Sequence, residues 1–158
     1  MDLNITINKI ASILFEKNLK IAIAESATGG LIANNITNIP GSSNFFDRGL
    51  VTYSNNAKIQ LLGVSKDLIQ KNGAVSSEVA LEMAEGARIN SNVDIGLSTT
   101  GIAGPTGGSK EKPVGLVFIA YSDKDKTISK KFVFNGSRLE NKKSFCDAAL
   151  NFLFENIK

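Results

Sequence analysis

The sequence of 158 residues contains no histidine and a single cysteine, Cys146. Without histidine, a Ser-His-Asp triad, a Cys-His pair and a histidine-ligated zinc site are all impossible. One cysteine excludes an intrachain disulfide and a cysteine-based metal cluster. If the chain is a hydrolase with a serine nucleophile, its base must therefore be Lys, Tyr, Asp or Glu.

Long apolar runs and dense clusters of one charge are also missing. No run reaches the length of a membrane span, and the first residues lack the pattern of a signal peptide. The 18 basic and 15 acidic side chains give a net charge of +3, and the lysines are scattered. We therefore predict neither a nucleic-acid nor a membrane partner, and a cytoplasmic location.

The sequence does contain enough apolar residues for a core, since 42% of it is hydrophobic. Its length predicts one domain over residues 1–158. Helical spacing or capping residues predict helices over 3–17, 31–37, 55–62, 65–71, from 75 onward, and 137–157. Apolar and β-branched runs predict strands over 19–24, 48–53, 93–99, 114–121 and 128–134. Early alternation followed by a hairpin indicates a three-layer α/β/α domain with a mixed sheet.

The stretch Ala22–Gly30 joins the first predicted strand to the second predicted helix. It places Ser26, Thr28 and two glycines in the connecting turn. Glycine allows a ligand to approach the backbone, and a helix N-terminus offers unpaired N–H groups. Ligands of open α/β sheets bind at the carboxyl ends of strands. The turn is therefore a candidate site, although an ordinary turn with Ser or Thr as the helix cap fits equally well.

A second candidate is the irregular stretch 100–113, which contains four glycines. It matches neither the Walker A spacing nor GxGxxG. A long irregular segment that leaves a buried strand is often functional, and the alternative is a mobile surface loop. The Ser109-x2-Lys112 pair inside it is interpreted as accidental. Cys146 is expected on the inner face of the last helix, as a core residue.

Tyr53 and Lys58 follow the second predicted strand. A lysine buried beside a serine can act as a base if its pKa falls from about 10.4 toward ~7–8. The alternative for such a lysine is a solvated surface charge. The Tyr-x4-Lys spacing differs from the Tyr-x3-Lys of short-chain dehydrogenases. Glu25, beside Ser26, can be a salt-bridge partner or a charge at the strand end.

Seven segments together resemble the CinA C-terminal domain family, which includes nicotinamide mononucleotide (NMN) deamidases. They occur in order at 24–30, 39–43, 46–58, 62–64, 73–76, 100–105 and 112–115. The sequence departs from the family at Ala27, where many members have cysteine. It also has only Arg138, followed by lysines, where an arginine pair is usual.

The resemblance implies an α/β domain of the stand-alone deamidase form and hydrolysis of the carboxamide of NMN to nicotinate mononucleotide and ammonia. By position, Ser26 is similar to the family nucleophile, Lys58 to its base, and Tyr53 to a residue that orients or relays the proton. No metal or cofactor is implied. A homodimer or higher oligomer is implied.

Substrate-binding residues are also expected from the resemblance and from amide chemistry. Backbone N–H groups around Thr28, Gly29 and Gly30 are candidate oxyanion donors. The candidates for holding the phosphate are Ser42, Ser43, Arg48, Gly101 and Gly104. For the two serines the alternative is a turn or a helix cap, and Arg48 can instead pair with Glu25 or Asp47.

Two other functions remain open from the sequence. The first is a non-catalytic domain that binds a nucleotide or a protein partner, because fold does not fix activity. The second is a carboxamide hydrolase that acts on free nicotinamide. A non-catalytic domain would bind NMN without turnover, which distinguishes it from an NMN deamidase. A hydrolase of free nicotinamide would have a rate that does not depend on the ribose phosphate.

Overall fold

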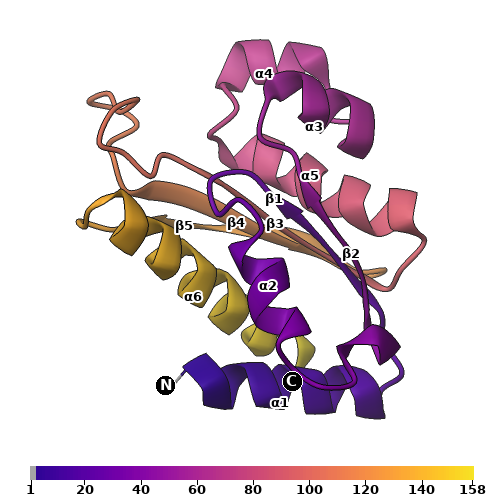
Figure 1. Ribbon diagram of the computed structural model, residues 1–158. Coiled ribbons are helices and arrows are strands. Elements are labelled where there is room, and N and C mark those ends of the chain that lie inside the picture. The colour runs from indigo at the N-terminus through magenta and orange to yellow at the C-terminus, as the bar shows by residue number, and fades with distance from the viewer. Residues whose placement is uncertain (1–2) are drawn as a thin grey trace.

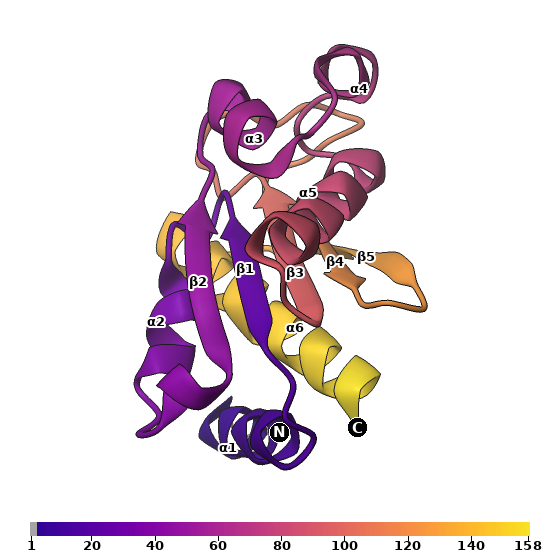
Figure 2. The same cartoon turned by 90° about the vertical axis from the view of Figure 1, so that its right-hand side faces the viewer.

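Five strands form one mixed sheet in the computed structural model, which describes residues 3–158. They are β1 (Ile21–Glu25), β2 (Phe46–Val51), β3 (Ile95–Gly101), β4 (Leu116–Ser122) and β5 (Thr127–Val133). Their order is β2-β1-β3-β4-β5, which Figure 2 shows from left to right. β1 is parallel to β2 and β3, whereas β4 is antiparallel to β3 and β5. The predicted mixed sheet and the late hairpin are confirmed.

Helices cover both faces of the sheet (Figure 1). One face carries α1 (Leu3–Glu16), α2 (Leu31–Thr37) and α6 (Arg138–Ile157), and the other carries α3 (Asn55–Leu62), α4 (Lys66–Asn72) and α5 (Ser77–Ser91). A short 3-10 helix, η1 (Ser42–Asn44), precedes β2. The predicted three-layer α/β/α arrangement is therefore confirmed. Within residues 3–158, no helix combines the length and the apolar character needed to cross a membrane.

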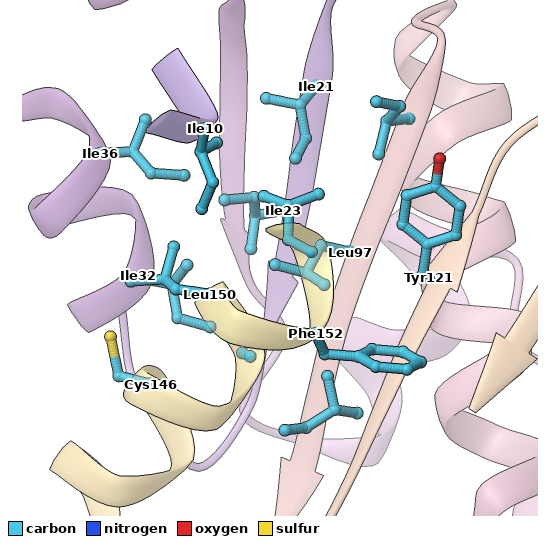
Figure 3. Packing of buried hydrophobic residues seen from close by; sticks show 14 of the residues in the cluster. Ile10, Ile21, Ile23, Ile32, Ile36, Leu97, Tyr121, Cys146, Leu150 and Phe152 are labelled. Carbon is cyan, nitrogen blue, oxygen red and sulfur yellow. The ribbon is translucent and has the colours of Figure 1, made fainter. Parts of the chain in front are cut away.

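The larger core lies between the sheet and the layer of α1, α2 and α6 (Figure 3). Side chains alternate along a strand, so Ile21 and Ile23 face this layer while Ala22 and Ala24 face α5. All four are fully buried because both faces of β1 are covered. Cys146 joins the larger core at 1% exposure, and burial raises the pKa of its thiol to about 12. This confirms its prediction as a core residue.

The opposite layer packs closely through small residues. A Cβ on Gly86 of α5 would lie 1.9 Å from the carbonyl oxygen of Leu62, the last residue of α3. Only glycine therefore allows α3 to rest directly on the backbone of α5. Contacts of this kind fix the position of α3, which carries Lys58.

Local capping begins four of the helices. The hydroxyls of Ser54, Ser65, Ser76 and Ser137 accept backbone N–H groups at the starts of α3, α4, α5 and α6. Strand ends differ from the predictions by about two residues. β3 continues through Thr100 to Gly101, which pairs with Val117, so the irregular stretch runs from 102 to 115 instead of 100 to 113. Interstrand hydrogen bonding, which local pattern does not show, decides where a strand ends.

Candidate active site

The carboxyl ends of three parallel strands meet at one edge of the sheet. Glu25, the last residue of β1, pairs with Val51 at the end of β2 and with Thr99 in β3. Ser26 therefore emerges beside Thr52 and Tyr53 on one side and beside Thr100 and Gly101 on the other. The turn at Ser26 and the glycine-rich loop, both predicted from the sequence as candidate sites, start at this edge.

Ser26 and Lys58 are in direct contact there. The Lys58 Nζ atom lies 3.1 Å from the Ser26 Oγ atom. Lys58 reaches inward from the first turn of α3, and its side chain is only 1% exposed, while Ser26 is 8% exposed. The alternative that Lys58 is a solvated surface charge is therefore wrong.

Two main-chain carbonyls complete the surroundings of the Lys58 amine. Its Nζ atom donates to the oxygen of Thr52 at 2.8 Å and to the oxygen of Tyr53 at 3.4 Å. Within residues 3–158, no carboxylate lies within salt-bridge distance of Lys58. Burial lowers the pKa of Lys58 from 10.5 to about 8, because the charged form loses its hydration.

The neutral amine fits this set of contacts. It has two N–H groups, which the two carbonyls can accept, and one lone pair, which remains for the hydroxyl proton of Ser26. The arrangement is therefore suited to a base that removes the proton from Ser26.

The N–H groups of the turn are not equally free. The Gly29 N–H donates to the Ser26 oxygen at 3.1 Å, and the Gly30 N–H donates to the carboxyl of Glu25 at 3.0 Å. Those two candidate oxyanion donors are therefore already engaged. In the described chain, the N–H groups of Ala27 and Thr28 have no acceptor. The Thr28 hydroxyl is paired with that of Thr99 at 2.9 Å, so only the main chain of Thr28 is available.

Among residues 3–158, Glu25 has no salt-bridge partner, and it is not an exposed charge at the strand end. Its side chain is fully buried and accepts three N–H groups at the start of α2. α2 therefore begins without a Ser or Thr cap of its own, and Gly30 stands at the cap position.

The Tyr53 hydroxyl has a different partner from the one expected. Its side chain is 61% exposed, and its oxygen accepts a hydrogen bond from Arg138 at 3.0 Å. The hydrogen bond from Lys58 to Tyr53 goes to the main-chain oxygen of Tyr53. This geometry places the ring at the rim of the site, and a part for the hydroxyl in the proton relay stays a prediction.

Three of the residues predicted to hold the phosphate lie elsewhere. Ser42 and Ser43 precede β2, whose first residue, Phe46, pairs with Ile21 at the opposite end of β1 from Ser26. Arg48 is also near that end and pairs with Asp47. A parallel register separates the two ends of these strands, and the sequence pattern did not show at which end the turn at 39–43 would lie. The structure therefore does not bring these three residues to Ser26.

A cavity of about 270 Å³ opens over the Ser26–Lys58 pair. Gly101 and Gly104, two of the residues predicted to bind substrate, line it, and Arg138 reaches it from the start of α6. The full lining comprises Ser26, Ala27, Tyr53, Asn55, Lys58, Ala74, Val75, Thr100, Gly101, Ile102, Ala103, Gly104, Thr106, Gly107 and Arg138. Arg138 was noted in the sequence only as a departure from a family pattern, and no local signal placed it beside Tyr53.

The glycine-rich loop is held against its neighbours. Arg138 donates to the Gly104 oxygen at 2.7 Å, Asn141 donates to the Ala103 oxygen at 3.0 Å, and Lys112 donates to the Asn72 oxygen at 2.5 Å. These contacts, from α6 on one side and α4 on the other, fix the loop as a wall of the cavity.

Comparisons with known proteins agree with this architecture. The sequence profile of the CinA C-terminal domain matches residues 4–157. A protein of Caldicellulosiruptor bescii, named as competence-damage inducible, is 53% identical over 148 residues, which are 94% of this chain and 36% of that protein. The chain thus spans about a third of the length of the curated relatives it matches.

Solved structures resemble the chain over almost their whole length. The crystal structure of competence/damage inducible protein CihA from Agrobacterium tumefaciens is 39% identical, with a TM-score of 0.95. The match covers 98% of this chain and 95% of the other. A CinA superfamily protein from Escherichia coli is 30% identical, with a TM-score of 0.92, over 98% and 92% of the two chains.

Proposed function

The chain belongs to the CinA C-terminal domain family, and from that premise we propose that it is an amidohydrolase with Ser26 as nucleophile and Lys58 as base. One observation carries the proposal. A lysine that is 1% exposed, with its pKa lowered to about 8, lies 3.1 Å from a serine hydroxyl at the floor of a cavity. A serine–lysine pair also explains how a sequence without histidine can hydrolyse an amide.

The first half of the reaction acylates Ser26. The neutral Lys58 amine takes the hydroxyl proton as the Ser26 Oγ atom attacks the carboxamide carbon. The developing oxyanion accepts hydrogen bonds from the free N–H groups of Ala27 and Thr28. The Lys58 ammonium then gives its proton to the amide nitrogen, the C–N bond breaks, and ammonia leaves.

The second half releases the acid. Water attacks the acyl ester carbon while Lys58 takes a proton from it, and the same proton returns to the Ser26 oxygen as the ester bond breaks. The sum is amide plus water giving carboxylic acid plus ammonia. Lys58 ends each cycle neutral because its proton is passed on in both halves.

The proposed substrate is NMN, and the support for it is the family resemblance. A phosphate at the rim of the cavity would have Arg138 as its cationic partner, since Ser42, Ser43 and Arg48 lie at the other end of the sheet. The guanidinium already donates two hydrogen bonds, to Gly104 and Tyr53, which hold its plane in place. In this proposal the pyridine ring packs against the exposed Tyr53 ring.

Ammonia release tests the proposal. The purified chain is incubated with NMN, and in parallel with free nicotinamide, and ammonia is measured in a coupled assay. We expect release from NMN and at least about tenfold slower release from nicotinamide, which lacks the ribose phosphate. Calorimetric binding of NMN without any turnover would instead favour a non-catalytic binding domain. Equal rates on both amides would favour a general carboxamide hydrolase.

The pH dependence of the reaction follows from Lys58. Its base function needs the neutral amine, so kcat/KM is expected to rise with pH and to level off above a midpoint near pH 8. Initial rates between pH 7 and 10 at constant ionic strength measure this limb and keep a substrate phosphate in one protonation state. A rate that is constant or falls across this range would show that Lys58 is not the base.

A further inference from the structure

Glu25 is a buried acid that the proposed chemistry does not use. Its side chain has no solvent exposure, and its two carboxyl oxygens take three main-chain N–H groups. One oxygen accepts Gly30 at 3.0 Å and Ile32 at 3.1 Å, and the other accepts Ala33 at 2.8 Å. The side chain thus reaches five to eight residues forward along the chain, past Ser26.

We propose that Glu25 is a positioning residue for Ser26. The Glu25 side chain closes the turn from 26 to 30, and it thereby orients the Ser26 hydroxyl and the free N–H groups of Ala27 and Thr28. The inference rests on the proposed function, since it takes Ser26 to be the nucleophile. Within residues 3–158, no hydrogen bond joins the Glu25 carboxyl to the Ser26 hydroxyl, so Glu25 acts through the backbone.

The main chain of Glu25 and its neighbour is fixed on both sides. The carbonyl oxygen of Glu25 accepts the Thr52 N–H at 2.9 Å, and the Ser26 N–H donates to the Thr99 oxygen at 3.0 Å. The carbonyl of Thr52 in turn accepts Lys58 at 2.8 Å. Glu25 is therefore hydrogen-bonded to Thr52, which holds the base Lys58, and it directly precedes the nucleophile Ser26 in the chain.

The side chain of Glu25 fixes the far end of the same turn. The turn is anchored at Ser26 by the bond to Thr99 and at Gly30 by the carboxyl of Glu25. Between these anchors lie Ala27 and Thr28, whose N–H groups have no acceptor in the described chain. Donors that are held in place before the reaction stabilise an oxyanion much better than mobile ones. Loss of one anchor would let this segment relax.

Helix capping alone does not require this arrangement. Helices α3, α4, α5 and α6 each begin with a serine that caps its own helix. α2 differs, because Gly30, with a φ of 98°, occupies the cap position and the acceptor comes from the preceding strand. The carboxyl therefore encloses the Ser26 turn while it satisfies the N–H groups of α2.

The test is Glu25→Gln, measured in two ways. Gln keeps the shape but replaces one acceptor oxygen by an NH₂ group, which has to face donors of α2. The second-order rate of Ser26 labelling by phenylmethanesulfonyl fluoride, followed by mass spectrometry, reports the nucleophile without any natural substrate. The kcat and KM for NMN are measured on the same preparations. We expect labelling and kcat to fall about tenfold to a hundredfold, with KM within about twofold of wild type.

Ser65→Ala is the matched control, because it removes a helix cap of α4 that lies outside the Ser26 turn. It should lower stability without lowering either rate. Denaturant unfolding of every variant shows which are folded. If Glu25→Gln is not folded, Glu25→Asp takes its place, since it keeps the acid and shortens the reach by one methylene.

The outcomes separate this inference from the proposed function. If the wild type is labelled at Ser26 but does not turn over NMN, the proposal that NMN is the substrate is wrong. The labelling rates of wild type and Glu25→Gln then still test the positioning role of Glu25. A folded Gln variant that labels as fast as wild type would overturn the positioning role while deamidation stands. A loss seen only in KM, or a wild type that is not labelled at Ser26, would also overturn it.

Discussion

Replacing Ser26 by alanine is expected to lower kcat for ammonia release from NMN by at least about 10³-fold, or ~4 kcal/mol. The variant keeps Lys58 and the free N–H groups of Ala27 and Thr28 but has no oxygen to form the acyl ester. Binding should persist, because Ser26 contributes one small side chain among the residues that line the cavity. The measurement is single-turnover ammonia release, with NMN affinity from calorimetry.

The control for this substitution is Ser12→Ala on the exposed surface of α1, where the hydroxyl donates to Glu16. It should leave kcat unchanged. In the wild type, a rapid acid quench followed by peptide mass spectrometry should find the acyl group on Ser26. Turnover by Ser26→Ala within about tenfold of wild type would remove the covalent mechanism, and water activated directly by Lys58 would then replace it.

Replacing Lys58 by methionine is expected to lower kcat by about 10²- to 10⁴-fold, the range that general-base catalysis contributes. Methionine has a similar length and no charge, so it fills the same buried space between Ser26 and Thr52. The rising limb of the pH profile near pH 8 should disappear with the amine. Retention of that limb in the variant would assign it to another group.

The same substitution makes a separate prediction about stability. The pKa of Lys58 is lowered in the folded chain, so between about pH 8 and 10.5 the unfolded state binds the proton and the folded state does not. Lys58 should therefore contribute a rise in wild-type stability with pH through this window, roughly 3 kcal/mol in total, and the Lys58→Met variant should lack this rise. The exposed Lys66, changed to methionine, is the matched control and should keep it. Burial of Cys146, which raises the pKa of its thiol, lowers the stability of both wild type and Lys58→Met alike as the pH increases.

Denaturant unfolding at pH 7.5, 9 and 10.5 measures the effect. As the pH rises, the unfolding free energy of the wild type should increase relative to that of Lys58→Met. A parallel pH dependence in both proteins would mean that the Lys58 amine keeps an ordinary pKa. In that case it would not be neutral near pH 8, and its role as a base would lose its physical basis.

The sequence by itself determined the elements and their packing faces. Apolar spacing located α1, and Ser137 with Glu140 three residues later forms the capping box that begins α6. These signals depend on neighbours within one or two helical turns, and the chain carries them whatever its tertiary structure. The absence of histidine likewise fixed which residue types could serve as a base.

Only the tertiary structure decided which polar residues share a site. Ser26 and Lys58 are 32 positions apart, and they meet because β1 and β2 are parallel and end together. The same register carries Ser42 and Ser43 to the far end of the sheet. Strand register is set by interstrand pairing across the fold, which no local spacing encodes.

Burial also belongs to the assembled fold. The sequence allowed Lys58 to be a surface charge, and it allowed Glu25 to be a strand-end charge. Packing of α3 on α5 removes Lys58 from water and lowers its pKa, and the start of α2 surrounds Glu25 with N–H donors. The chemistry of a titratable group depends on its solvation and its partners, and both arise only when distant segments come together.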